Sequence, residues 1–370
     1  MFLKSINLVN FKNYEAVELT FHPKINCLVG DNGEGKTNLL DAVYYLTFCK
    51  SFLNPIDSQN VKIGSDFLLI QGEFEKAEKP YPIHCGIKKG QKKVFKINKK
   101  EYDKLADHIG EFPLVIISPA DINLITEGSD LRRKFLDGIL AQYDKTYLDL
   151  LFQYAKVLNQ RNALLKFFSK ERTFSAEQLE IWDEQLIRLG KILGEKRAKL
   201  SEELIPVFQK YYTKISGSKE KVGLRYESQL LEGDFKELLD SNIQKDIQRQ
   251  HSTVGIHKDD LLFTLESQPA KKFASQGQQK TYLIALKLAQ LEFLKNTKQE
   301  TPILLLDDIF DKLDENRVGQ LLELVNSNEF GQIFITDTDK NRIERILARV
   351  NSSSFIFKVS NGKVEKLLKV

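Results

Sequence analysis

Runs of apolar residues near both ends of the chain predict β-strands. Some runs alternate apolar with polar positions, and others, such as 303–306, are continuously apolar. A helical pattern at 38–50 follows one of these strands. In chain order the predicted strands are 3–11, 17–21, 26–30, 67–75, 81–89, 93–98, 114–119, 224–227, 261–266, 302–308 and 331–339. We therefore expect an α/β fold at both ends of the chain.

The middle of the chain follows a helical period instead. Between about 131 and 213 there is little strand signal, and apolar residues recur at spacings of three and four. Ser175 and Gln178 form a capping-box pattern that opens a second long helix, which Pro206 should kink or end. Two such helices predict an antiparallel helical arm inserted into a larger domain. The expected divisions are 1–125, 126–215 and 216–370.

Composition and charge are those of a soluble globular protein. Of the 370 residues 42% are hydrophobic and 29% are charged, which argues against disorder. The net charge of +4 permits a local anion-binding face but does not imply a coat of nucleic acid. Cys27, Cys49 and Cys85 have no CxxC spacing, so neither a zinc site nor a disulfide framework is expected.

The sequence predicts neither export nor a membrane span. Its first residues alternate and carry charges, which is typical of a strand rather than of a signal peptide. No window approaches 18 uninterrupted apolar residues. Together with the cysteine usage, these features predict a reducing, cytoplasmic location.

The segment GDNGEGKT at 30–37 matches the phosphate-loop pattern G-x-x-x-x-G-K-[ST] and lies between a predicted strand and a predicted helix. The glycines let backbone N–H groups point at phosphate oxygens. Lys36 reaches the β- and γ-phosphates, and Thr37 offers a hydroxyl to Mg²⁺. The alternative is a glycine-rich turn before a helix, and the agreement of motif with context argues against it. The residues expected to bind nucleotide are Gly30, Asp31, Asn32, Gly33, Glu34, Gly35, Lys36, Thr37 and Asn38.

The apolar run 303–306 ends in the pair Asp307 and Asp308. A P-loop ATPase needs a carboxylate at the end of a buried strand to hold the Mg²⁺ shell, and Asp307 suits that role. Asp308 is then placed to orient the water that attacks the γ-phosphate. The alternative is a strand followed by an acidic turn. Most of the chain separates Lys36 from Asp307, as expected of a P-loop domain interrupted by an arm.

The stretch FASQGQQK at 273–280 precedes an apolar helical run. Ser275 and Gln278 fit a capping box, but a cap does not explain Gly277, which costs a helix about 1 kcal/mol relative to alanine. The position of this stretch before the acidic strand resembles the signature motif of ABC-type ATPases. The resemblance implies that the motif faces the γ-phosphate of ATP held by a partner chain, so that two subunits enclose two nucleotides. The residues assigned in this way are Ser275, Gln276, Gly277 and Gln278.

Further blocks narrow the resemblance. Asn38 after the P-loop threonine is similar to the SMC and RecF branch of these ATPases rather than to transporters. The opening LKSINLVNFKNY and the segments 127–166, 252–263 and 304–314 look like the RecF family. These blocks span nearly the whole chain in the family's order. The chain is therefore identified as a member of the RecF family of bacterial DNA replication and repair proteins.

The resemblance implies a fold and an activity. The fold is an α/β ABC-type P-loop ATPase head of two lobes with an inserted α-helical lid or arm. ATP and Mg²⁺ are the expected cofactors, and weak ATP hydrolysis is expected to act as the switch of an ATP-dependent homodimer. The expected DNA is duplex or a single-strand/double-strand junction at a gap. The implied partners are RecO and RecR, which help to load RecA in recombinational repair and the SOS response.

Three other classes of P-loop protein agree less well with the sequence. An SMC-like structural ATPase needs hundreds of residues of heptad repeat, and the arm is too short. A transporter-type ATPase subunit favours a catalytic Glu and a switch His, whereas this chain has Asp308 and either Thr336 or Asp337 there. A kinase for a small molecule does not explain FASQGQQK. The two departures from the transporter pattern are Asp308 in place of a glutamate and the missing switch histidine, and both predict slow ATP hydrolysis.

Position in the family also assigns residues outside the main motifs. Leu313 and Asp314 are expected in a loop that crosses the dimer interface. Lys12, Asn13 and Tyr14 resemble the family segment near the nucleotide base.

Residue type and position give three weaker assignments. Gln71, after the strand FLLI, is assigned a contact with Mg²⁺, and the alternative is a glutamine with no special role. The segment 88–100 holds seven lysines and no acids, which predicts either a cationic ridge for DNA phosphates or an edge strand protected by lysines. These lysines are Lys88, Lys89, Lys92, Lys93, Lys96, Lys99 and Lys100. His257, in the block STVGIHKDD, is expected at the surface, and the alternative is a contact with nucleotide or DNA. The pattern gives no physical reason for the composition of that block.

Overall fold

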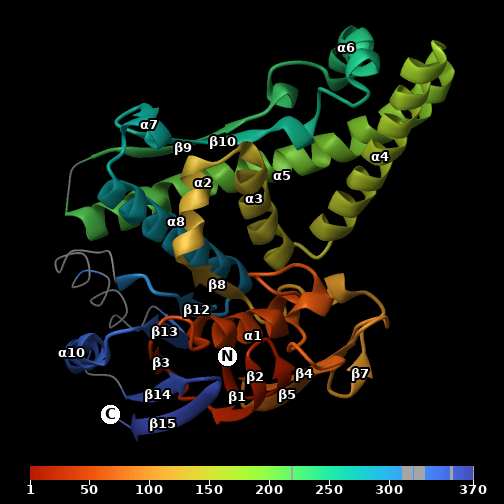
Figure 1. Cartoon of the computed structure of the whole chain (residues 1–370). Coiled ribbons are helices and arrows are strands. Elements are labelled where there is room, and N and C mark those ends of the chain that lie inside the picture. The colour runs from red at the N-terminus through yellow and green to blue at the C-terminus, as the bar shows by residue number, and fades with distance from the viewer. Residues whose placement is uncertain (218–219, 311–319, 321–329, 351–352, 370) are drawn as a thin grey trace. The chain divides into compact units, whose positions relative to one another are not determined.

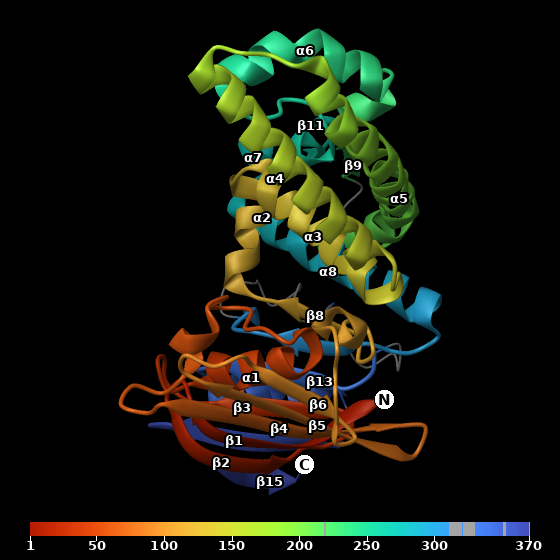
Figure 2. The same ribbon diagram turned by 90° about the vertical axis from the view of Figure 1, so that its right-hand side faces the viewer.

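The computed structural model describes residues 1–217, 220–310, 320, 330–350 and 353–369. The chain forms two compact units, whose elements are labelled in Figures 1 and 2. The head unit comprises Met1–Ile122, Tyr211–Ser218 and Gln276–Val370. The helical unit comprises Asn123–Lys210 and Lys219–Ser275.

A six-stranded, mostly parallel sheet forms one layer of the head unit, in the order β15-β14-β3-β13-β12-β8. Its strands are β3 Ile25–Val29, β8 Leu114–Ile117, β12 Ile303–Leu306, β13 Ile333–Asp337, β14 Ser354–Ser360 and β15 Lys363–Lys369. Every residue of β3, β8, β12 and β13 is buried. Their continuously apolar sequences follow from this, because both faces of a parallel sheet are covered.

An antiparallel sheet of six strands forms a second layer, in the order β2-β1-β4-β5-β6-β7. Its strands are β1 Phe2–Phe11, β2 Tyr14–Thr20, β4 Phe67–Lys76, β5 Lys79–Lys88, β6 Val94–Ile97 and β7 Lys100–Glu101. Helix α1 (Lys36–Phe48) contacts β1, β4 and β5 of this sheet and β8 and β13 of the other. Apolar side chains from both sheets and from α1 form one buried core, which holds the start of α1 in place.

Helices α8 (Gln276–Lys298) and α10 (Lys340–Val350) also belong to the head unit. Helix α8 is buried along most of its length and packs against β8. The head unit also has short 3₁₀ helices at Asp57–Asn60, Leu105–His108 and Pro119–Ile122.

The helical unit combines long helices with a small antiparallel sheet, in the order β11-β10-β9. Its elements are α2 Asn123–Thr126, α3 Ser129–Tyr143, α4 Tyr147–Glu171, α5 Ala176–Ser216, β9 Val222–Glu227, η4 Gln229–Leu231, α6 Phe235–Arg249, η5 Ile256–Lys258, β10 Asp260–Leu265, β11 Gln268–Pro269 and α7 Ala270–Phe273. Helix α3 packs on β10, and α4 packs on α6. The last residues of α5 belong to the head unit.

The predicted elements are confirmed with small shifts at their ends, but two details differ. Pro206 does not end its helix, because α5 continues through it as one helix of 41 residues. Leu204 and Phe208, on either side, are fully buried, and their packing offsets the backbone hydrogen bond that proline cannot make.

The second difference concerns the predicted boundary at 216. Residues 219–275 form a compact unit with the long helices, because β10 lies on α3 and α6 lies on α4. The inserted part of the chain is therefore larger than the arm expected at 126–215. No helix within the described ranges is long and apolar enough to cross a membrane.

Candidate nucleotide-binding site

The phosphate loop joins the buried strand β3 to helix α1. Gly33 and Gly35 have φ angles of 85° and 114°, in the left-handed region where glycine is favoured. Lys36 is the first residue of α1, and no side chain among the described residues makes a capping hydrogen bond at that helix start. The first N–H groups of α1 are therefore available to an anion, which is the arrangement that binds phosphate.

Lys36 lies across the loop from which it comes. Its Nζ donates hydrogen bonds to the carbonyl oxygens of Gly30, at 2.8 Å, and of Asp31, at 2.9 Å. The side chain is buried, with 4% exposure. A phosphate would supply stronger, charged acceptors for the same ammonium group.

Thr37 and Asp307 meet although most of the chain separates them. The Thr37 hydroxyl donates to Asp307 Oδ1 at 2.9 Å and lies 3.1 Å from Oδ2. The sheet brings them together, because β13 pairs in parallel with both β3 and β12. A hydroxyl and a carboxylate side by side are hard oxygen ligands of the kind that Mg²⁺ prefers, so these residues suit the predicted metal shell.

Thr336 organises the acidic pair. Its hydroxyl donates to Asp307 Oδ1 at 2.8 Å and accepts the backbone N–H of Asp308 at 2.9 Å. Burial raises the pKa of the Asp307 carboxyl, while the hydrogen bonds from Thr336 and Thr37 lower it in part. Asp308 has a φ of 46°, which is unusual for a residue other than glycine. Sequence reasoning missed this supporting role of Thr336.

Asp337 is the second of the two residues, after Thr336, that could stand in the place of a switch histidine. It ends β13, is buried, and accepts a hydrogen bond from the backbone N–H of Asp339 at 2.8 Å. Burial raises the pKa of its carboxyl, and the nearby Arg342 opposes that shift. Leu313 and Asp314 lie outside the described residues.

The turn between β1 and β2 supports the phosphate loop from outside. The Tyr14 hydroxyl donates to the carbonyl of Gly35 at 2.8 Å, and Asn13 Nδ2 donates to the carbonyl of Glu34 at 2.9 Å. Asn38 in turn donates from Nδ2 to Asn13 Oδ1 at 2.7 Å. These residues therefore shape the loop, and a contact between them and the nucleotide base stays a prediction.

Lys12 contributes to the same corner through a different partner. Its ammonium forms an ion pair with Asp41 at 2.6 Å. Asp41, on α1, also accepts hydrogen bonds from Ser51 Oγ and from the backbone N–H of Phe52, each at 2.6 Å. This buried carboxylate thereby ties the segment after α1 to the β1–β2 turn.

The signature-like segment lies where α8 begins. Ser275 and Gln276 are exposed, whereas residues 281–291 of α8 are all buried. The Thr281 hydroxyl donates to the carbonyl of Gly277 at 3.1 Å. A helix that is buried along its length and exposed at its N-terminus presents that terminus outward, as a phosphate held by another chain requires.

Gln71 lies in the middle of β4 and not at the end of a strand. Its amide nitrogen is 3.2 Å from His84 Nδ1, on the neighbouring strand β5. No contact in the described part of the chain joins Gln71 to Thr37 or Asp307. The described contacts therefore add nothing to its assigned role in binding Mg²⁺.

The seven lysines of 88–100 do not all face outward. Lys93 is half-buried, and its Nζ forms an ion pair with Asp57 at 2.8 Å and donates to the carbonyl of Cys49 at 2.6 Å. Its charge is paired within the head unit, so Lys93 is not part of the expected cationic ridge. Lys96 is half-buried as well, and the exposed lysines are Lys88, Lys89, Lys92, Lys99 and Lys100.

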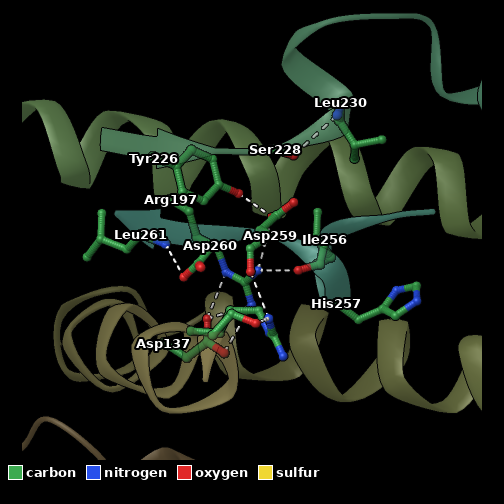
Figure 3. A network of polar contacts seen from close by, with 12 residues as sticks. Asp137, Arg197, Tyr226, Ser228, Leu230, Ile256, His257, Asp259, Asp260 and Leu261 are labelled. Atoms are coloured by element: carbon green, nitrogen blue, oxygen red, sulfur yellow. Dashed lines mark hydrogen bonds and ion pairs between the residues drawn. The ribbon is translucent and has the colours of Figure 1, made fainter. Parts of the chain in front are cut away.

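The structure gives a physical reason for the block STVGIHKDD, which lies in the helical unit. Figure 3 shows Arg197 of α5 beside Asp137 of α3 and Asp259 of this block. Its guanidinium lies 2.9 Å from Asp137 and 3.3 Å from Asp259, and it donates to the carbonyl of Ile256 at 2.8 Å. Tyr226 of β9 donates its hydroxyl to Asp259. The block is therefore the buried joint between two helices and the small sheet.

His257 is not the surface residue that was expected. Its Nδ1 is 3.0 Å from the Tyr154 hydroxyl, and its Nε2 is 3.0 Å from the carbonyl of Ser252. Burial lowers the pKa of His257 to about 4, so the imidazole is neutral at physiological pH. With both nitrogens engaged, His257 is a structural member of the joint.

The chain is similar in sequence to known proteins. The family model RecF/RecN/SMC N terminal domain matches residues 2–364. The DNA replication and repair protein RecF of Flavobacterium johnsoniae is 55% identical over 91% of this chain and 94% of its own length. The RecF of Phocaeicola vulgatus is 51% identical over 98% of both chains.

Solved structures agree with the sequence matches. The recombination mediator protein RecF with ATP, in the RecFOR pathway, has a TM-score of 0.90 and 32% identity, and the match covers 99% of this chain and 98% of that one. An Smc head bound to the C-terminal winged-helix domain of ScpA has a TM-score of 0.60 at 14% identity, covering 100% of this chain and 98% of that one. The second likeness shows a shared fold alone.

Proposed function

The chain belongs to the RecF family of DNA replication and repair proteins, and from this premise we propose that it is a DNA-binding protein whose dimerisation is switched by ATP. The observation that carries the proposal is the meeting of Thr37 with Asp307 beside the phosphate loop. That pair supplies a metal shell at the point where a helix N-terminus can hold phosphate. The solved relative that contains ATP supports the same ligand.

The chain's own residues account for ATP binding. The N–H groups at the start of α1 bind the phosphates, and Lys36 exchanges its loop carbonyls for phosphate oxygens. Mg²⁺, held by Thr37 and Asp307, would neutralise charge that develops on the transferred phosphoryl group. Asp308 orients the attacking water. Its side chain is shorter than glutamate, and either Thr336 or Asp337 stands where a switch histidine would, so hydrolysis is slow.

Dimerisation follows from the exposed start of α8. Ser275 and the N-terminus behind it form an anion site without any reactive group. Such a site suits the γ-phosphate of ATP bound to a second copy of the chain. ATP thereby holds two subunits together, and its hydrolysis releases them.

DNA and protein partners complete the proposal. Five exposed lysines on β5, β7 and the adjoining turns offer a sequence-independent, salt-sensitive contact for phosphates. Gapped duplex DNA is the proposed substrate, with RecO and RecR as partners in loading RecA. The pathway in which a solved relative is placed supports this choice of partners. An SMC-like structural role is disfavoured, because α4 and α5 have only 25 and 41 residues.

Binding to gapped duplex DNA tests the proposal. Fluorescence anisotropy of a labelled gapped duplex should report tighter binding with Mg-ATP than with Mg-ADP, and the affinity should fall steeply with salt. The Lys36→Ala variant should lose the effect of ATP and keep the salt-sensitive basal binding. Equal binding with ATP, with ADP and without nucleotide would contradict the proposed switch.

A further inference from the structure

The turn between β14 and β15 lies beside the phosphate loop. Strand β14 pairs in parallel with β3, the strand that leads into the loop, and Lys358 lies opposite Val29. The turn that follows is formed by Asn361 and Gly362, with φ angles of 50° and 70°. This turn therefore lies next to the phosphate loop, on the side where β14 pairs with β3.

The hairpin lies against the phosphate loop at two positions, Glu34 and Gly30. The backbone N–H of Asn361 donates to Glu34 Oε2. At the start of the loop, a Cβ added to Gly30 would collide with the carbonyl oxygen of Val359. The loop and the hairpin thus lie backbone against backbone, and a glycine is required at position 30.

The same turn also packs against Asn13, the residue that supports the loop from the other side. A Cβ at Gly362 would lie 2.7 Å from the carbonyl oxygen of Asn13. Asn13 donates to the carbonyl of Glu34 at 2.9 Å. Glu34 is therefore held twice, by its carbonyl and by its carboxylate.

We propose that the turn at Asn361 and Gly362 is a positioning element of the nucleotide site, which preorganises the phosphate loop through Glu34. The turn's hydrogen bond engages the Glu34 carboxylate, and Asn13 engages the Glu34 carbonyl, so neither contact uses the N–H groups that bind phosphate. A loop fixed in this way loses less conformational entropy when nucleotide binds. The inference rests on the proposed binding of ATP.

A simpler hypothesis treats Glu34 as an exposed charge. The two hypotheses predict opposite changes in nucleotide affinity for the Glu34→Ala variant. A free carboxylate in a phosphate loop repels the nucleotide, so both Glu34→Gln and Glu34→Ala would then tighten binding. A positioning role makes the two variants differ. The glutamine keeps an oxygen that accepts the Asn361 N–H, whereas the alanine has none.

Titration of the full-length chain with Mg-ATP, followed calorimetrically, separates the two views. Glu34→Ala should weaken binding about five- to ten-fold, within the range for losing one typical hydrogen bond, while Glu34→Gln should bind at least as tightly as the wild type. Turnover at saturating ATP should change little, so KM rises without a matching fall in kcat. Binding by Glu34→Ala as tight as wild type, or by Glu34→Gln as weak as Glu34→Ala, would overturn the inference.

A second pair of variants tests the turn itself. Gly362→Ala should weaken Mg-ATP binding, because its new methyl group meets Asn13. Gly90→Ala is the matched control, since Gly90 lies in another hairpin turn with a φ of 77° and nothing within 4 Å of an added Cβ. Equal affinities of the two variants would contradict the inference. A wild-type chain that binds no ATP would instead overturn the proposed function, and the inference with it.

Discussion

At the scale of single residues, one hydroxyl organises the acidic end of the site. Thr336 donates to Asp307 and accepts from the backbone of Asp308, whose left-handed conformation costs about 1–2 kcal/mol elsewhere. Thr336 is fully buried, so bulk water does not reach its hydroxyl. The carboxylate proposed to bind Mg²⁺ and the backbone of the residue proposed to orient water therefore share one support.

Replacing Thr336 with valine removes both hydrogen bonds while keeping the shape of the side chain. Supporting residues of this kind change metal affinity or activity by about 10- to 100-fold, and we expect a loss in that range for Mg²⁺-dependent ATP turnover. Phosphate release, measured against Mg²⁺ concentration, is the direct assay. Thr336→Ser should restore most of the rate. A valine variant with wild-type turnover would show that Thr336 has no such role.

Motifs indicate the candidate ligand-binding residues, and they miss the residues that hold the site in shape. Lys36, Thr37 and Asp307 were predictable because their types and spacing are fixed by phosphate and Mg²⁺ chemistry. The roles of Asn13 and Thr336 depend on hydrogen bonds between segments far apart in the chain. No local pattern encodes such contacts, so they required the structure.

At the scale of elements, helix α5 depends on a charge buried in its apolar face. Leu193, Leu200 and Leu204 are fully buried, and Arg197 falls on the same stripe. Burial of a guanidinium is tolerable only when acids and carbonyls satisfy it. The joint shown in Figure 3 provides these partners and fixes α5 against α3 and the small sheet.

Replacing Arg197 with methionine should destabilise the protein strongly. The change leaves Asp137 and the buried Asp259 without their cation, and breaking a buried pair in this way costs about 3–5 kcal/mol. The free energy of unfolding, measured in urea, should fall by that amount. Lys199→Met is the matched control, because Lys199 is 77% exposed and should cost less than about 0.5 kcal/mol. Equal stability of the two variants would contradict the role given to the joint.

Helical periodicity predicted α4 and α5, but not how far α5 extends or what packs on it. Pro206 is tolerated because buried side chains on both sides hold the helix. An arginine among the apolar positions of a helix indicates buried partners for its charge, so this feature of Arg197 could have been recognised from the sequence. Its partners in STVGIHKDD could not be identified, because their contacts with α5 arise only in the folded chain.

At the scale of the whole molecule, the nucleotide site is assembled from segments along almost the entire chain. The β1–β2 turn, the phosphate loop, the ends of β12 and β13, and the β14–β15 turn all contribute. Family resemblance predicted this head and an inserted helical part. It did not predict that 219–275 would belong to the inserted part, because that depends on tertiary packing.

We propose that FASQGQQK completes its site only on a second copy of the chain. Mass by light scattering, with Mg-ATP, with Mg-ADP and without nucleotide, measures this directly. Asp308→Asn slows hydrolysis, so that the ATP state persists. Adding Ser275→Arg blocks the proposed contact, and Ser175→Arg is the control, since Ser175 holds the same capping position before α5.

We predict a dimer with Mg-ATP alone, which Ser275→Arg abolishes and Ser175→Arg preserves. The dimer should also be absent with Mg-ADP and without nucleotide. A chain that binds ATP and remains monomeric in every state, with gapped duplex DNA present as well, would contradict the claim that ATP joins two subunits.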